Sequence, residues 1–169
     1  IVALLDRSAS TGDAERLLRG SEFFRGLVER HIRWLEQDAD LTATNLAGEF
    51  DTFEARLSAE GSALESEVTL TSALRVLRQR AMLHIVWRSF TSETGLDETL
   101  STMSALADCV IRVAVSFAEA TLAKRFGYPI GEESGKQQTL IVIGMGKLGG
   151  QELNLSSDID IMFAYDEAG

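Results

Sequence analysis

Apolar residues recur every three or four positions through most of the first three quarters of the chain, and this spacing constrains the fold most strongly. The segment SEFFRGLVERHIRWLEQ follows it from Ser21, and LTSALRVLRQRAMLHIVWRSF follows it from Leu70 to Phe90. A period near 3.6 is typical of amphipathic helices, with Ser21 as a helix cap and Pro129 as a stop signal after Gly127. The predicted helices span residues 21–38, 42–57, 70–90 and 96–127.

The pattern changes after residue 130. Residues 131–138, GEESGKQQ, are polar and have no apolar period, which indicates a boundary between two parts of the chain. The runs TLIVIG and DIDIMFAY that follow predict two strands on either side of a short glycine-rich connection. We therefore predict a mainly α fold with a small α/β part. A helical region covers 1–134, and the incomplete start of a second domain covers 135–169.

Composition excludes several classes of function. The 169 residues are 45% hydrophobic, enough for a core, and the formal net charge of −10 argues against a surface that binds nucleic acid. The single Cys109 lies among apolar residues and is predicted to belong to that core. The stretch VIRVAVSFAEATLA contains Arg112 and Glu119, and is too polar and too short for a membrane span. With no signal peptide pattern at the start, we expect a cytoplasmic protein without a membrane partner.

Three glycines after the first predicted strand raise the possibility of a dinucleotide site. Gly144, Gly146 and Gly149 fit the order G-x-G-x-x-G, and Asp166 ends the next strand about where a ribose-binding acid would lie. That fold needs a crossover helix of about a dozen residues, and the segment 151–157 is too short for one. The P-loop pattern fails as well, because no Ser or Thr follows the lysine. A dinucleotide site is therefore the least favoured alternative.

Two aspartates, Asp158 and Asp160, head the second apolar run. Because side chains alternate along a strand, both carboxylates are predicted on one face, opposite Ile159 and Ile161. Two carboxylates this close repel each other unless a cation lies between them or one is protonated. Hard divalent cations such as Mg²⁺ bind one or two carboxylates together with substrate phosphates. We therefore predict that Asp158 and Asp160 hold Mg²⁺ or Mn²⁺ and are the catalytic residues of a phosphate chemistry.

Residues around the aspartates suit a phosphate group. Gly149 and Gly150 let the backbone approach a polyphosphate and direct N–H groups at it. Ser157, next to Ser156, adds a hydroxyl donor, and Lys147 adds a positive charge. The predicted nucleotide and phosphate ligands are therefore Gly149, Gly150, Ser157 and Lys147.

The string GMGKLGGQELNLSSDIDIMFAY, residues 144–165, closely resembles the bacterial glutamine synthetase adenylyltransferase family. A Gly-Gly turn followed by D-x-D is similar to the entry motif of the nucleotidyltransferase superfamily, which has a polymerase β-like fold. The helical segments LRVLRQRAMLHIVW and SEFFRGLVERHIRWLEQ resemble the region before the first of that family's two nucleotidyltransferase domains. The resemblance is strong from Thr139 onward and looser before it.

This resemblance implies a function. Family members attach AMP to a tyrosine of glutamine synthetase and remove it again, and the motif wording resembles the N-terminal half, which removes AMP. The implied reaction is a metal-dependent attack of inorganic phosphate on adenylyl-tyrosine that gives ADP, with ATP as the nucleotide of the opposite reaction. The implied metal ligands are Asp158 and Asp160, and the implied partners are glutamine synthetase and the nitrogen-signalling PII protein.

One departure from the superfamily pattern limits this expectation. A third carboxylate normally comes from a later strand, and Asp166 and Glu167 lie too near the motif to supply it. We therefore expect the isolated chain to be inactive. A second interpretation is a helical regulatory or interaction module of the same enzyme with no chemistry of its own.

Other conspicuous side chains are predicted to be structural. His31 and His84 lie on different helices without Cys or Asp at metal-ligand spacing. Trp34 and Trp87 fit the apolar periods of their helices and are predicted to be core residues. The basic residues of the third helix are also interpreted as structural: Arg75, Arg78, Arg80 and Arg88.

Overall fold

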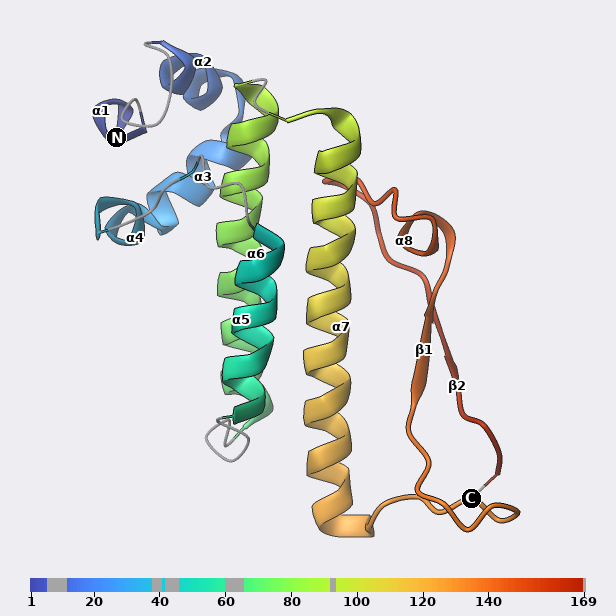
Figure 1. Cartoon of the computed structure of the whole chain (residues 1–169). Coiled ribbons are helices and arrows are strands. Elements are labelled where there is room, and N and C mark those ends of the chain that lie inside the picture. The colour runs from blue at the N-terminus through green and yellow to red at the C-terminus, as the bar shows by residue number, and fades with distance from the viewer. Residues whose placement is uncertain (6–11, 38–40, 42–45, 60–65, 92–93, 169) are drawn as a thin grey trace.

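The computed structural model describes residues 1–5, 12–37, 41, 46–59, 66–91 and 94–168 (Figure 1). It is mainly helical, with a small two-stranded antiparallel sheet near the C-terminus, which confirms the predicted fold class. The helices are α1 Val2–Leu5, α2 Asp13–Gly20, α3 Glu22–Arg30, α4 Ile32–Gln37, α5 Leu46–Ala59, α6 Glu67–Phe90, α7 Leu96–Phe126 and α8 Gly146–Gly149. The strands are β1 Ile141–Gly144 and β2 Ile161–Ala164.

The first predicted helix is divided in two. Ser21 caps α3 as expected, because its side chain accepts a hydrogen bond from the Phe24 N–H at 3.1 Å. The prediction of one helix over 21–38 was wrong, since α3 ends at Arg30 and α4 begins at Ile32. His31 between them has φ −112° and ψ 18°, and its Nε2 lies 2.8 Å from Gln79 Oε1 of α6. The break therefore coincides with a contact to another helix.

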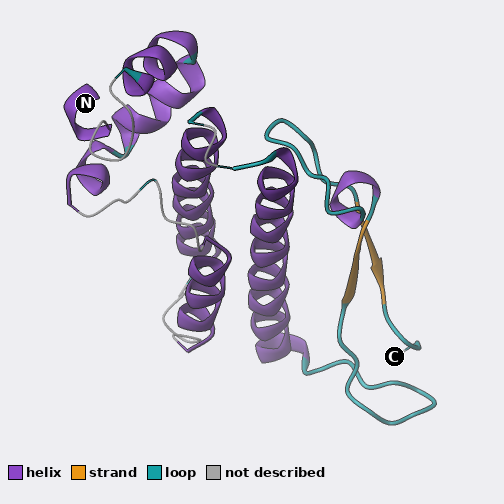
Figure 2. Ribbon diagram, turned by 45° about the horizontal axis from the view of Figure 1, so that its top comes forward, coloured by secondary structure: helices purple, strands orange, loops and turns teal. Residues whose placement is uncertain are grey.

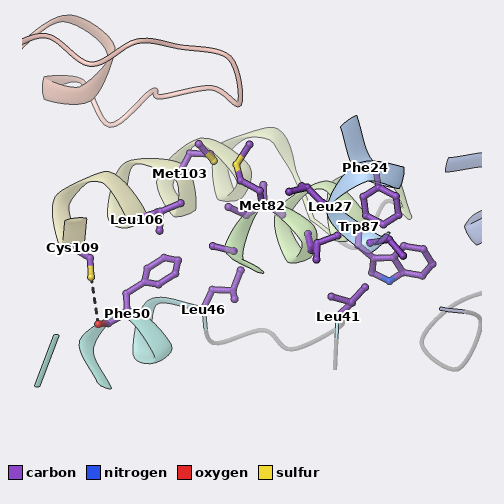
Figure 3. Close-up of a cluster of buried hydrophobic side chains, with 14 of the residues drawn as sticks. Phe24, Leu27, Leu41, Leu46, Phe50, Met82, Trp87, Met103, Leu106 and Cys109 are labelled. Carbon is purple, nitrogen blue, oxygen red and sulfur yellow. Dashed lines mark hydrogen bonds between the residues drawn. The ribbon is translucent and has the colours of Figure 1, made fainter. Parts of the chain in front are cut away.

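The helical core lies where α3 meets α6 and where α5 and α6 meet α7 (Figure 3). Trp87 is fully buried, and its ring stacks on Phe24 with centroids 6.2 Å apart. Cys109 is also fully buried, and its thiol donates to the Phe50 carbonyl at 3.5 Å. Burial raises the pKa of this thiol. Trp87 and Cys109 are therefore core residues, as predicted.

Two of the arginines on α6 make structural contacts. The Arg80 guanidinium lies 4.8 Å from the ring centroid of the half-buried Trp34, and Arg88 pairs with Glu98 of α7 at 3.0 Å. Both contacts agree with the structural interpretation. Arg75 and Arg78, by contrast, are exposed.

Helix α7 is long and apolar. Its 31 residues include an 18-residue window of mean hydropathy 1.5, of which 28% is buried, so its length and composition would allow it to span a membrane. The sequence argument that this stretch is too polar and too short for a membrane span was therefore wrong. Two of its charged side chains are engaged within the protein: Arg112 Nε donates to Glu54 Oε2 at 2.8 Å, and Glu119 accepts the Leu140 N–H at 2.9 Å. Core helices of soluble proteins pass the same length and composition test.

The two strands form a ribbon beside α7 (Figures 1 and 2). They pair antiparallel, with Ile141 opposite Ala164 and Gly144 opposite Ile161. A dinucleotide-binding fold instead joins parallel strands through a crossover helix. The antiparallel pairing of β1 with β2 therefore contradicts the dinucleotide alternative. The four-residue α8 occupies the connection between them.

Candidate functional site

The glycine-rich turn at the end of β1 is a close-packed bend. Gly146 has φ +52°, a backbone conformation that favours glycine. A Cβ atom on Gly149 would overlap the Gly144 carbonyl oxygen, closer than any side chain permits. Leu148, on the inner side of α8, is 2% exposed and anchors the turn. The sequence G-x-G-x-x-G thus forms a tight β1 to α8 turn here.

The two adjacent glycines differ in their surroundings. Gly149 is required by its approach to Gly144, which is a structural reason. A Cβ atom on Gly150 would meet its nearest neighbours at 3.5 and 3.8 Å, which are ordinary contacts. Packing within the chain therefore explains why residue 149 is a glycine, but it does not explain why residue 150 is one. Gly150 is the better candidate for a glycine needed by a ligand.

The aspartates lie directly before β2. The expectation that both stand on the strand was wrong, since β2 begins at Ile161. The ladder continues by one hydrogen bond, from the Met145 N–H to the Asp160 carbonyl at 2.8 Å. Asp160 Oδ2 lies 4.0 Å from the position of a Cβ on Gly146. Asp158 and Asp160 are both exposed, and within the described residues neither carboxylate takes part in a hydrogen bond or ion pair.

Asn154 organises the loop before the aspartates. Its Oδ1 accepts hydrogen bonds from the Ser157 hydroxyl at 2.7 Å and from the Ser156 N–H at 3.2 Å. Lys147 Nζ of α8 donates to Ser157 Oγ at 3.3 Å. The structure therefore brings Lys147 and Ser157 into direct contact, while Asn154, a residue that the sequence analysis missed, holds the Ser157 hydroxyl from the other side. An Asn two and three residues before serines is typical of a side-chain-stabilised turn, and that was the available signal.

Glu167 belongs to a different part of the ribbon. Its carboxylate accepts the Glu133 N–H at 2.8 Å and the Ser134 N–H at 3.1 Å. The hydrogen bonds from Ser134 and Glu133 lower the pKa of Glu167. This carboxylate stabilises the 131–138 turn, away from Asp158 and Asp160. The predicted boundary at 134 and 135 falls within that turn and stays a prediction.

Asp158 and Asp160 supply only two carboxylates as candidate metal ligands. No group of three or more His, Cys, Asp or Glu side chains gathers at metal-binding distance in the described ranges. Two exposed carboxylates separated by one residue, without a cationic partner among the described side chains, have the hard oxygen chemistry that Mg²⁺ and Mn²⁺ prefer. A substrate phosphate and water would complete such a coordination. The pair therefore fits a cation that is shared with a phosphate ligand.

Comparisons with known proteins show which family this chain resembles. The family described as glutamate-ammonia ligase adenylyltransferase (GlnE) matches residues 12–169. A bifunctional glutamine synthetase adenylyltransferase/adenylyl-removing enzyme from Thioalkalivibrio sulfidiphilus is 45% identical over 157 residues, which cover 91% of this chain and 16% of that protein. Its counterpart from Pseudomonas aeruginosa is 41% identical over 163 residues, covering 96% of this chain and 15% of that protein. These relatives are nucleotidyltransferases.

The chain belongs to the GlnE family, which confirms the resemblance found in the sequence. It spans about a sixth of the length of these relatives, 16% in the first case. The match includes both the helical region and the motif before β2.

Proposed function

We propose that this chain is part of the half of a GlnE-type enzyme that removes AMP from adenylyl-tyrosine of glutamine synthetase by phosphorolysis, giving ADP. Membership of the family and the wording of the motif GMGKLGG with NLSSDID support this assignment. The observation that carries the proposal is the exposed pair Asp158 and Asp160: Asp158 follows Ser157 directly, and Asp160 Oδ2 lies 4.0 Å from the position of a Cβ on Gly146.

The aspartates and their neighbours have distinct roles in this proposal. Asp158 and Asp160 would hold Mg²⁺ or Mn²⁺, which would supply positive charge to the phosphate oxygens. Lys147 and Ser157, which are already joined by a hydrogen bond, bind phosphate oxygens. Gly150 lets the backbone approach the nucleotide closely. Little covalent chemistry is required from the protein, because phosphoryl transfer depends on positioning and charge stabilisation.

The partners follow from the same proposal. The relatives are named for their action on glutamine synthetase, and we propose the same substrate protein here. The nitrogen-signalling PII protein is proposed as the regulator, and the cytoplasm as the location. A net charge of −10 supports the absence of a nucleic-acid partner, and we propose no membrane partner.

The test measures phosphate-dependent release of ADP from adenylylated glutamine synthetase by the full-length polypeptide that contains this chain. The double variant Asp158→Asn, Asp160→Asn keeps side-chain volume and removes both charges. Because metal-held charge is worth several kcal/mol, we expect release to fall by on the order of 100-fold or more. The variant Asp166→Asn is the matched control, since it neutralises an exposed aspartate outside the cluster.

The possible results separate the competing interpretations. Loss of ADP release in the double variant but not in Asp166→Asn supports the proposed site. Undiminished release by the double variant overturns the assignment of both aspartates. If wild-type protein releases no ADP yet binds glutamine synthetase, and the double variant binds equally well, the chain is an interaction module and the proposed reaction is wrong.

A further inference from the structure

A buried serine on α7 contacts the loop that carries the candidate site. Ser104 is fully buried, and its Oγ donates to the Leu100 carbonyl of its own helix at 2.9 Å. The same oxygen accepts the Leu153 N–H at 3.2 Å, across 49 residues of sequence. Leu153 is 3% exposed. The helical region is thus joined by a buried hydrogen bond to the loop that leads from Leu153 to Asp158.

Two further hydrogen bonds join the same side of α7 to the ribbon. Gln151 Nε2 donates to Asp108 Oδ2 at 3.4 Å, and the Leu140 N–H donates to Glu119 Oε1 at 2.9 Å. Residues 108 and 119 lie about one and about four helical turns beyond residue 104, so all three lie on one face of the helix. The contacts extend over about 22 Å of helix at a rise of 1.5 Å per residue. The ribbon is therefore held along α7 at several points, and Ser104 is the buried one.

Leu153 is the last described residue before the aspartates that is hydrogen-bonded to α7. Asn154 follows it directly and gathers the hydroxyls of Ser156 and Ser157, after which Asp158 begins the approach to β2. Holding the Leu153 backbone therefore sets where the Asn154 turn starts. Removing the Ser104 oxygen would leave a buried N–H without a partner, which the loop can relieve only by moving toward water.

We propose that Ser104 is a positioning residue, which places the 154–158 loop so that Ser157, Asp158 and Asp160 meet the metal and phosphate in one geometry. This inference rests on the proposed function. It gives the helical region a direct role at the site, because a shift of α7 would move the loop through the Ser104 contact. Residues that orient metal ligands from behind commonly contribute about 10 to 100-fold in metal affinity or activity.

The experiment compares three variants of the full-length polypeptide that contains this chain. Ser104→Ala removes the acceptor oxygen, and Ser104→Cys keeps a side chain of at least the original volume but replaces the oxygen with sulfur, a weak acceptor. Ser101→Ala is the matched control, because Ser101 makes a similar bond to its own helix, to the Glu98 carbonyl at 3.1 Å, but is exposed. The measurements are kcat, the Mn²⁺ concentration for half-maximal rate, and hydrogen exchange of peptides spanning residues 150–158.

We expect Ser104→Ala and Ser104→Cys to lower kcat about tenfold and to raise the Mn²⁺ requirement. The KM for adenylylated glutamine synthetase should stay unchanged in both variants. Exchange in residues 150–158 should be faster, while Ser101→Ala behaves as wild type. A loss of folded protein would lower the rate without changing the Mn²⁺ requirement, so this readout distinguishes positioning from stability.

Three results would overturn the inference. Recovery of wild-type kinetics in Ser104→Cys would show that the position matters for volume rather than for its hydrogen bond. Kinetics of Ser104→Ala equal to those of Ser101→Ala would show that the loop is positioned without Ser104. Unchanged exchange in residues 150–158 would show that the contact does not hold the loop. Hydrogen exchange tests whether Ser104 holds the loop even if wild-type protein releases no ADP. Absence of ADP release would reject the proposed function but not the Ser104 contact.

Discussion

The helical region and the β1–α8–β2 ribbon are held together by different forces. In the helices many of the largest side chains are buried, as Phe24 and Trp87 at 0% exposure illustrate. In the ribbon the apolar side chains stand largely in solvent, with Phe163 59% and Ile143 43% exposed. A two-stranded antiparallel ribbon has little stability by itself. Its position here depends on two buried leucines, Leu148 and Leu153, and on hydrogen bonds that it donates to side chains of α7.

This difference predicts how the two regions respond to change. Removing a core side chain should lower the free energy of unfolding of the helical region, because many packed residues lose contacts together. Changes in the ribbon should instead act locally, on a few hydrogen bonds and on the site. The ribbon can therefore be altered at its turns while the helices keep their stability, and the following tests address that separation.

Truncating Trp87 should produce the largest effect. The ring is fully buried and stacks on Phe24, so Trp87→Ala leaves a cavity between α3 and α6. Buried Trp to Ala changes cost about 3 to 5 kcal/mol of the free energy of unfolding. Urea denaturation followed by circular dichroism measures the loss. Phe126→Ala is the control: this aromatic residue at the end of α7 is 70% exposed, and its truncation should change stability by less than about 0.5 kcal/mol.

The two neighbouring glycines should separate structure from ligand binding. Gly149→Ala would place Cβ against the Gly144 carbonyl oxygen, so the turn must shift, at a cost of about 1 to 3 kcal/mol. Gly150→Ala meets only ordinary contacts, so the ribbon should keep its structure. We expect faster exchange in β1 for Gly149→Ala alone. Gly150→Ala should lower ADP release without changing exchange.

The opposite pattern would change the interpretation of this turn. If Gly150→Ala keeps full activity, the proposal that the backbone approaches the nucleotide closely at Gly150 is wrong. If Gly149→Ala leaves β1 undisturbed, the ribbon is softer than its packing indicates. Both outcomes are read from the same pair of variants.

The helices could be predicted from sequence because their signals are local. The Ser21 cap, the apolar periods and Gly127 at the end of α7 each act within a few residues, and the structure confirms them. The break at His31 was not predictable in this way. Its ring contacts Gln79, 48 residues away, and no local pattern reports that contact.

The candidate site was predictable in composition but not in arrangement. Asp158, Asp160 and Ser157 stand out as residue types in a motif, whereas their exact relation to β2 depends on where the ladder starts. Asn154 could have been found from its turn chemistry. Ser104 could not, since a lone serine within an apolar helix period gives no sign of a partner 49 residues later.

A final, smaller effect concerns the pH dependence of the 131–138 turn. Hydrogen bonds from Ser134 and Glu133 lower the pKa of Glu167, so folding favours its ionised form. The stabilisation is therefore present above the unfolded-state value of about 4.3 and is lost as pH falls through the lower pKa of the folded state. The amide proton shifts of Glu133 and Ser134, followed by NMR, should titrate with a midpoint below about 4.3.

The variant Glu167→Gln should abolish this titration while core resonances of α6 stay unchanged, since among the described residues the Glu167 side chain hydrogen-bonds only within the 131–138 turn. A midpoint at or above the ordinary glutamate value would mean that the turn does not use the carboxylate charge. A matching titration in α6 would mean that the ribbon and the helical core respond together. Either result would weaken the separation between packed helices and a ribbon held by individual polar contacts.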